Sequence, residues 1–410
     1  MDKARIRIAA LSAMTQTCMA LRHIAQPYLY HYPCVRAPVV YQLLLRTLVE
    51  RPDLAQYINE LSAFDMTCDD IRLISRIQPH IRHVEERMVL RHTRECDRYH
   101  DPPSRGKRVD IKYDVNTLFT TIVLPFGTSL QTLHLELSED CEFPSCEPGS
   151  LPQLKELVVK NWDAEESLAI RVIASILIAS PALERLGGLK IFLAEWEGPQ
   201  PPIHEDVKEI WFEQSVLGPE GVAVLLGLFP RLEAFTYESD DDNSTASVSE
   251  IGEALLACQD LRFLSLDFTN CQNGGEVYPT NQPRGGSLAE LKKLQKFCVK
   301  GLTLFRETEW LGRSPITISN MLPTSITELE VTRPSDIIFD DLLELSGVAS
   351  QRFPLLKHVS IDGIEQECEV FDWRQRVCMG LESINKLRQA FGQSGIELST
   401  GDFGKFVGFF

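Results

Sequence analysis

The stretch PRLEAFTYE, residues 230–238, decides the fold that the sequence predicts. Its pattern is apolar-x-x-apolar-x-apolar, and it ends with a period of two at Phe235 and Tyr237. Side chains alternate across a β-strand, so we expect Phe235 and Tyr237 on one face and Thr236 and Glu238 on the other. The stretch therefore predicts a short strand with one buried face.

The same pattern recurs along much of the chain. It is found in eight further segments: 129–137, 152–160, 181–191, 207–214, 259–268, 292–300, 324–332 and 353–361. The first apolar anchors of the nine segments are Leu130, Leu154, Leu183, Val207, Leu232, Leu261, Leu294, Ile326 and Leu356. Successive anchors are 24 to 33 residues apart, by subtraction of these numbers.

A recurrence of roughly 20–30 residues with this core is typical of the leucine-rich repeat. Each unit is too small to bury its own apolar strand face, so neighbouring units stack into a solenoid. Between the strand segments, apolar residues recur every three or four positions, which predicts helices at 166–180, 219–229, 247–258 and 374–395. We therefore predict an α/β fold: a leucine-rich-repeat-like solenoid with irregular repeats over residues 116–410, ending in a helical cap.

Composition limits the classes of partner. The chain has 58 Asp and Glu against 41 Lys and Arg, a formal net charge of −17, and such a surface repels phosphate backbones. Its eleven cysteines have no framework spacing, which is typical of reduced thiols in a cytoplasmic or nuclear protein. No apolar run reaches the roughly 18 residues that a bilayer requires. We expect neither nucleic acid nor membrane as a partner.

No catalytic motif is recognisable, and we expect no enzymatic activity and no cofactor. The sequence lacks a G-x-S-x-G elbow, a Walker phosphate loop, a G-x-G-x-x-G turn opening a helix and an H-E-x-x-H pair. His92, Cys96 and His100 follow at i, i+4 and i+8, which is the closest approach to a metal site. Interleaved arginines disfavour a cation there and no fourth ligand is evident, so we predict an exposed, charged helix end and no metal.

The N-terminal segment, residues 6–30, has an apolar helical face that includes Leu11 and Met14, and the helix is expected to end before Pro27. Within it, the string T-C-x-x-L-R-x-I-A-Q-P-Y-L-Y, residues 17–30, resembles the C-terminal half of the F-box as it occurs in F-box proteins of filamentous fungi. The usual F-box opens with a Leu-Pro segment and a first helix. Only Met1 to Ala10 precede the helical part that contains this string and begins at Leu11, so the N-terminal half of the F-box is missing from the match.

The resemblance implies a particular organisation and function. It implies a small all-α partial F-box segment at 1–35. The pattern of apolar residues predicts a helical segment at 36–115 with a first atypical repeat at 53–61, and the fungal family has a similar segment in that place. The N-terminal helices of such a protein dock onto the Skp-type adaptor of a cullin–RING ubiquitin ligase, and its repeats hold a protein substrate. The residues that the resemblance assigns to adaptor contact are Leu11, Met14, Leu21, Ile24, Pro27 and Tyr28.

Substrate contacts follow from the strand pattern. The outward strand positions that we predict to contact a substrate are His134, Lys160, Trp211, Tyr237 and Lys357. A slip of one residue in strand phase inverts such an assignment. Two alternatives remain open: residues 11–30 form a cap that covers the open end of the first repeat, or the repeats are a scaffold that binds protein partners without ligase function.

Overall fold

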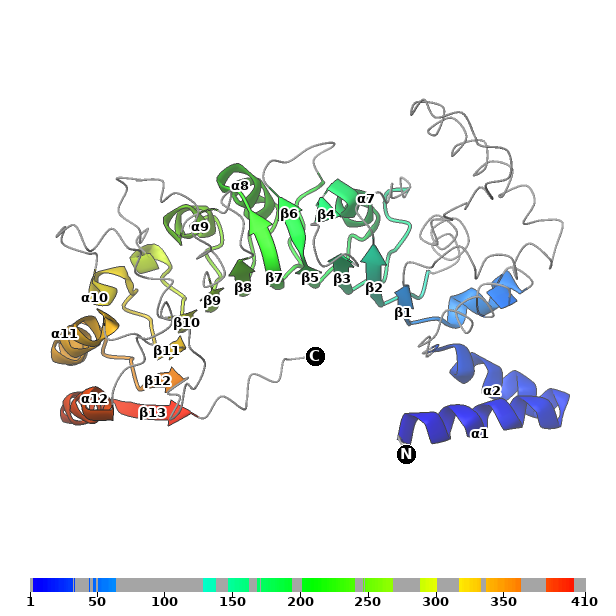
Figure 1. The fold of residues 1–410 in the computed structure, drawn as a ribbon. Coiled ribbons are helices and arrows are strands. Elements are labelled where there is room, and N and C mark those ends of the chain that lie inside the picture. Colours follow the sequence, from blue (N-terminus) through cyan, green and yellow to red (C-terminus); the bar gives the residue numbers. More distant parts are fainter. Residues whose placement is uncertain are drawn as a thin grey trace, which may run out of the picture. The chain divides into compact units, whose positions relative to one another are not determined.

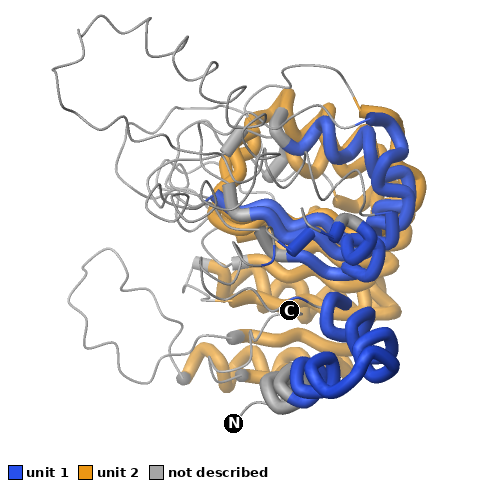
Figure 2. Tube along the Cα trace, turned by 90° about the vertical axis from the view of Figure 1, so that its right-hand side faces the viewer, with its two compact units in different colours: residues 1–183 blue, residues 184–410 orange. Residues whose placement is uncertain are grey.

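A computed structural model of the chain describes residues 3–31, 33, 44, 47–48, 51–63, 128–137, 147–161, 168–169, 171–193, 201–239, 246, 248–267, 288–300, 317–332, 337–362 and 381–401. Two units are distinguished, residues 1–183 and residues 184–410 (Figure 2). Parallel strands and helices make up both units, so the α/β class is confirmed.

The first unit begins with helices. They are α1 (Lys3–Thr17), α2 (Met19–His31) and the short 3₁₀ helix η1 (Pro52–Tyr57). α1 and α2 pack against each other, and α2 also contacts η1. The expectation of one helix ending before Pro27 is wrong, because the helix is interrupted at Cys18 and Pro27 lies inside the second helix, α2. A proline removes one helical hydrogen bond, and here the packing of α2 on its neighbours outweighs that loss.

The strands of the first unit are parallel in the order β1-β2-β3. They are β1 (Glu60–Ala63), β2 (Thr132–Leu137) and β3 (Glu156–Asn161). The short strand β4 (Leu168–Ala169) and the helix α7 (Arg171–Ala179) follow. The segment 53–61, predicted as a first atypical repeat, contains buried Leu54 and Leu61 and leads into β1. The His92–His100 series and most of the helical segment predicted at 36–115 lie outside the described residues.

The second unit contains a longer parallel sheet. Its strands are β5 (Arg185–Leu189), β6 (Ile191–Leu193), β7 (Glu209–Leu217), β8 (Ala234–Ser239), β9 (Phe263–Asp267), β10 (Lys296–Lys300), β11 (Glu328–Thr332), β12 (His358–Asp362) and β13 (Glu397–Gly401). From β7 to β13 each strand pairs with the next along the chain; β5 pairs with β7, and so does β6. The sheet is therefore open, with neighbours in space that are also neighbours in sequence.

Helices connect these strands. They are α8 (Pro219–Gly227), α9 (Val248–Leu255), η4 (Leu288–Glu290), α10 (Ile318–Met321), α11 (Ile337–Arg352) and α12 (Leu381–Gln393). Figure 1 shows α8 to α12 along one side of the strands. In α12 the predicted apolar stripe is confirmed at Ile384, Leu387 and Phe391, which are buried. That helix ends before Gly395, whose φ of +74° suits a glycine.

One turn geometry precedes the strands of the second unit. Five apolar anchors of this unit donate their amide to the carbonyl three residues earlier, as Leu232 N does to Phe229 O at 3.1 Å; the other four are Leu261, Leu294, Ile326 and Leu356. The carbonyl of Glu233 then accepts bonds from Arg262 N at 2.8 Å and Phe263 N at 3.0 Å, both in the following repeat. Five other carbonyls accept such a pair of bonds: those of Glu184, Lys208, Arg262, Gln295 and Thr327. Local geometry is thus constant although the connecting segments differ in length.

The nine predicted strand segments all contain a strand. Their anchors are at most 5% exposed, so they form a continuous apolar row within each unit. In β8, Phe235 and Tyr237 are fully buried while Thr236 and Glu238 are partly exposed, which confirms the alternation expected from the sequence. Burial of this strand face against the connecting helices stabilises the packing of the helices on the sheet.

Candidate protein-binding sites

One side of the strands in the second unit faces away from the helices (Figure 1). We define the open face by the alternate strand positions of β7, β8 and β9 on that side. They are Glu209, Trp211, Glu213, Ala234, Thr236, Glu238, Phe263, Ser265 and Asp267, and all are partly exposed. Because the strands are parallel and in register, side chains at equivalent positions form rows across this face.

Trp211 is held on the open face by a glycine. Gly187 of β5 is opposite Trp211 in the register, and a Cβ on Gly187 would lie 2.3 Å from the indole Cε2 and Cζ2. The indole therefore covers the Gly187 backbone. Next to it, Gly188 is opposite Phe212 on the core side, where a Cβ would lie 2.6 Å from Phe212 Cδ1. Two adjacent glycines thus leave room for an aromatic ring on each face of β5.

A β-bulge fixes Glu213 beside this tryptophan. The β7–β8 register shifts between Phe212 and Ser215, and the Glu213 carbonyl accepts bonds from Lys190 N at 3.0 Å and from Ser215 Oγ at 2.8 Å. Burial raises the pKa of the Glu213 carboxyl. Within the described residues, no hydrogen bond or ion pair is made to this carboxylate. Bulges often lie beside functional positions, and here the bulge presents a partly desolvated anion.

Charges are distributed unevenly across the strands. The nine open-face positions include four carboxylates and no lysine or arginine. On the adjacent strands, by contrast, Lys296 of β10 is 3.2 Å from Glu330 and 3.7 Å from Glu328, both of β11. Charges on β10 and β11 therefore compensate one another, and the charged side chains among the nine open-face positions are all carboxylates.

The predicted substrate residues differ in position and exposure. Three of them lie on strands: His134 of β2 and Trp211 of β7 are partly exposed, and Lys160 of β3 is exposed. Lys357 is also exposed, but it lies in the turn that precedes β12. The assignment of Tyr237 to the outward set is wrong. Tyr237 is in phase with Phe235 and fully buried, and its hydroxyl donates to Ser215 O at 2.9 Å. Within the second unit, β8 to β11 separate Trp211 from Lys357.

The predicted adaptor residues lie on the helical pair. Leu11 and Met14 are on α1, and Leu21, Ile24, Pro27 and Tyr28 are on α2. Only Ile24 and Tyr28 of this set are largely exposed, at 59% and 67%, and their i, i+4 spacing puts them on one helix face. The sequence reasoning missed Met19, which is 64% exposed at the start of α2.

A polar cluster on β12 and β13 also escaped the sequence reasoning. Ser399 Oγ is 3.0 Å from His358 Nε2, and His358 Nδ1 is 3.8 Å from Glu397 Oε2. The order of groups is that of a serine nucleophile, a base and an orienting acid. Glu397 is 79% exposed and too far from the imidazole for a hydrogen bond, so it does not orient the histidine. The cluster therefore lacks one element of nucleophilic catalysis.

The described ranges show neither a metal site nor a membrane-spanning helix. They contain no group of three or more His, Cys, Asp or Glu side chains arranged to hold a metal ion. None of their helices combines the length and apolar character needed to span a bilayer. Comparison of the sequence with models of known protein families gives no match, and comparison with curated proteins gives none either. The F-box and leucine-rich-repeat resemblance therefore stays a prediction.

Proposed function

We propose that this chain is a protein-interaction module of the leucine-rich-repeat type that serves as an F-box-type substrate receptor of a cullin–RING ubiquitin ligase. In this function the repeats form a solenoid that binds a protein substrate, and α1 and α2 attach it to the Skp-type adaptor. The observation that carries the proposal is the side of the parallel strands that faces away from the helices, with its partly exposed polar and aromatic side chains. Repeat arrays use such extended surfaces for binding.

The helical pair supports the adaptor contact. Ile24 and Tyr28 expose apolar surface on one face of α2, and Met19 adds a third large apolar side chain to the same helix. Contiguous exposed apolar groups mark interaction surfaces more often than isolated ones do. Burying two such side chains against an adaptor contributes about 3 kcal/mol or more, which corresponds to at least a hundredfold in affinity.

Binding of the full-length chain to a purified Skp-type adaptor tests this function. We expect the wild-type chain to bind, and the double variant Ile24→Ala, Tyr28→Ala to bind at least tenfold more weakly. The matched control is Gln16→Ala, an exposed position on α1, which is expected to bind within twofold of wild type. Circular dichroism establishes that each variant is folded. If the folded wild-type chain does not bind the adaptor, the receptor function is wrong.

A repeat scaffold without ligase function is the second candidate. The observation that favours it is the way α2 joins the start of the sheet. Asn59 N, next to β1, donates to the last residue of α2, His31 O, at 3.1 Å, and α2 contacts η1. These contacts suit a helical cap over an exposed repeat end. A wild-type chain that is folded, fails to bind the adaptor and still binds peptide at the strands would establish this alternative.

A further inference from the structure

We propose that the open face binds an arginine side chain of the partner protein, stacked on the Trp211 indole and paired with the Glu213 carboxylate. The proposal rests on the protein-binding function above and names the chemistry of the partner segment. Its basis is one aromatic ring and one carboxylate, both on the same face of β7 and two residues apart. We define these two side chains as the arginine site.

The ring is a fixed platform. Because the indole lies against Gly187, one of its faces is covered by backbone while Trp211 as a whole stays partly exposed. A flat ring that cannot rotate into the sheet loses little entropy when a ligand stacks on it. Tryptophan is also the best aromatic partner for a cation, with attraction that grows as the cation is desolvated. The glycine therefore prepares the ring for a stacked cation.

The Glu213 carboxylate extends from a fixed backbone position and has no partner among the described residues. Its backbone is held at the bulge by two hydrogen bonds to the Glu213 carbonyl, so the side chain begins from a defined point. Partial burial has removed some of its water without a compensating cation. A cation arriving from the partner would restore that lost stabilisation, which is the condition for a strong charged hydrogen bond.

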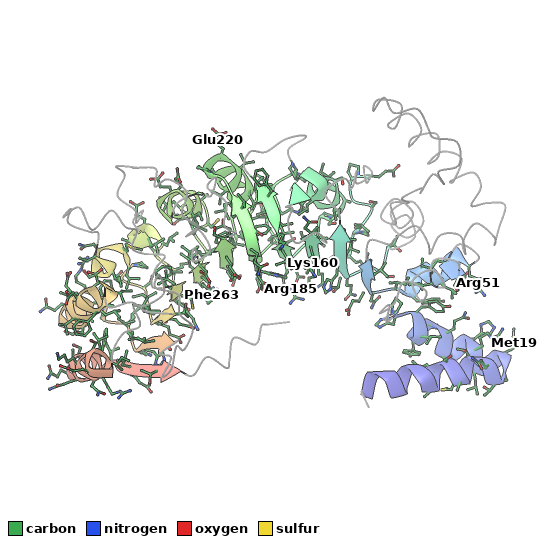
Figure 3. All side chains as sticks on the ribbon, viewed as in Figure 1. Met19, Arg51, Lys160, Arg185, Glu220 and Phe263 are labelled. Carbon is green, nitrogen blue, oxygen red and sulfur yellow. The ribbon has the colours of Figure 1, made fainter. Side chains whose placement is uncertain are left out.

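Other charged side chains lie at both ends of these strands. At the end away from Glu213, Arg185 of β5 is next to Glu209 in the register, so a positive side chain is already present there. Arg185 lies on the side of the strands away from α8, the helix that carries Glu220 (Figure 3). Glu213 lies at the bulge and has no register partner on β8, while Glu238 and Asp267 are paired in the β8–β9 register. Among the described residues, no cation is paired with the Glu213 carboxylate.

Arginine fits the pair better than lysine. Its guanidinium is planar, stacks on an aromatic face, and presents paired N–H groups that match a carboxylate. One arginine can therefore contact the ring with its face and the carboxylate with its edge. Lysine offers a compact charge that remains strongly hydrated and has no planar face. The expected partner is thus an extended protein segment with an exposed arginine.

Peptides of defined sequence test the arginine site. The probe is a nonapeptide with one central arginine in a glycine–serine background, and the comparison peptide has citrulline, which is planar but uncharged. Both are titrated into the full-length chain while the indole N–H resonance of Trp211, assigned with Trp211→Phe, is followed by NMR. We expect the arginine peptide to shift this resonance and to bind at least fivefold more tightly than the citrulline peptide.

Two variants of equal charge separate the site from general attraction to an acidic protein. Glu213→Gln is expected to weaken binding of the arginine peptide at least fivefold. Glu220→Gln removes the same charge from α8, on the helix side, and is expected to change binding less than twofold. Equal binding of the two peptides, or equal loss in the two variants, would overturn the proposal.

The outcome is separable from that of the adaptor experiment. Selective binding of the arginine peptide without adaptor binding would support the arginine site and contradict the ligase function. Adaptor binding together with equal affinity for the arginine and citrulline peptides retains the receptor and removes the arginine site. Circular dichroism of Glu213→Gln identifies a loss of binding that comes from unfolding, and Trp211→Phe, which keeps a ring over Gly187, is then expected to retain part of the arginine preference.

Discussion

At the scale of single residues, Asp341 of α11 is a buried carboxyl whose pKa is strongly raised. Its side chain is 8% exposed, and within the described residues its Oδ2 has no hydrogen-bond partner. Burial raises the pKa of Asp341 to about 6; the charges of Glu344 and Asp340 add to the rise, and a hydrogen bond from the backbone of Ile318 opposes it. The folded state therefore favours the protonated form.

The ionisation of Asp341 makes the free energy of unfolding depend on pH. A carboxyl whose pKa is higher in the folded state makes its stabilising contribution below the unfolded value of 3.8, and that contribution is lost as pH rises through about 6. We expect Asp341→Asn to raise the free energy of unfolding by about 1–3 kcal/mol at pH 7.5, because it removes a buried charge and keeps an acceptor for Ile318. At pH 4 the two proteins should be equally stable.

Urea denaturation at pH 7.5 and pH 4 measures this effect. The control is Asp340→Asn, an exposed neighbour, which is expected to change the unfolding free energy by less than about 0.5 kcal/mol. A destabilised Asp341→Asn protein at pH 7.5 would contradict the account, since it would mean that the charged carboxylate has a partner that stabilises it.

At the scale of elements, the pairing of β5 with β7 depends on two glycines. Gly187 and Gly188 stand opposite Trp211 and Phe212 in the register. A Cβ on Gly188 would lie 2.5 Å from Ile191 Cγ1 and 2.6 Å from Phe212 Cδ1. Interiors are packed too closely to accept an added carbon at such distances without movement. The two glycines therefore admit two large rings, one on each side of the sheet.

We expect Gly188→Ala to lower the free energy of unfolding by about 1–3 kcal/mol, the usual cost of overpacking. The matched control is Gly347→Ala in the middle of α11, where an added Cβ meets nothing within 4 Å. That change is expected to stabilise the protein by about 0.5–1 kcal/mol, because alanine is the better helix former. Urea denaturation compares the two. Equal effects of the two substitutions would show that the β5–β7 contact tolerates the extra carbon.

At the scale of the whole molecule, negative charge dominates. The formal net charge of −17 produces repulsion that unfolding relieves. Several of the ion pairs in the described ranges, such as Arg51–Asp53 and Lys386–Glu382, are between exposed side chains and contribute little. Screening by salt should therefore remove more repulsion than attraction.

We expect the Tm, measured by differential scanning fluorimetry, to rise by about 2–5 °C between 0.05 and 0.5 M NaCl. Choline chloride at the same ionic strength is the control, because it screens charge without a small cation that binds carboxylates. A similar rise in both salts indicates screening. A fall in Tm with either salt would show that ion pairs outweigh the net repulsion.

The sequence by itself determined the α/β class, the positions of the strands and the alternation within β8. These features are local, since a strand needs only its own period of two and a turn needs only its few residues. The same turn bond is present at seven of the nine anchors, which explains why these segments share one pattern although the anchors are 24 to 33 residues apart. The expected end of the N-terminal helix at Pro27 failed because packing within the helical pair overrides a local signal.

The tertiary structure alone decided which side chains meet. Gly187 is 24 residues before Trp211 in the chain, and only the β5–β7 register shows that the missing side chain of Gly187 makes room for the Trp211 indole. The bulge at Glu213 and the satisfied hydroxyl of buried Tyr237 are likewise non-local. The physical reason is that periodicity fixes the face of a residue within its own strand, whereas the neighbour on that face depends on the hydrogen-bond register between strands that are far apart in sequence.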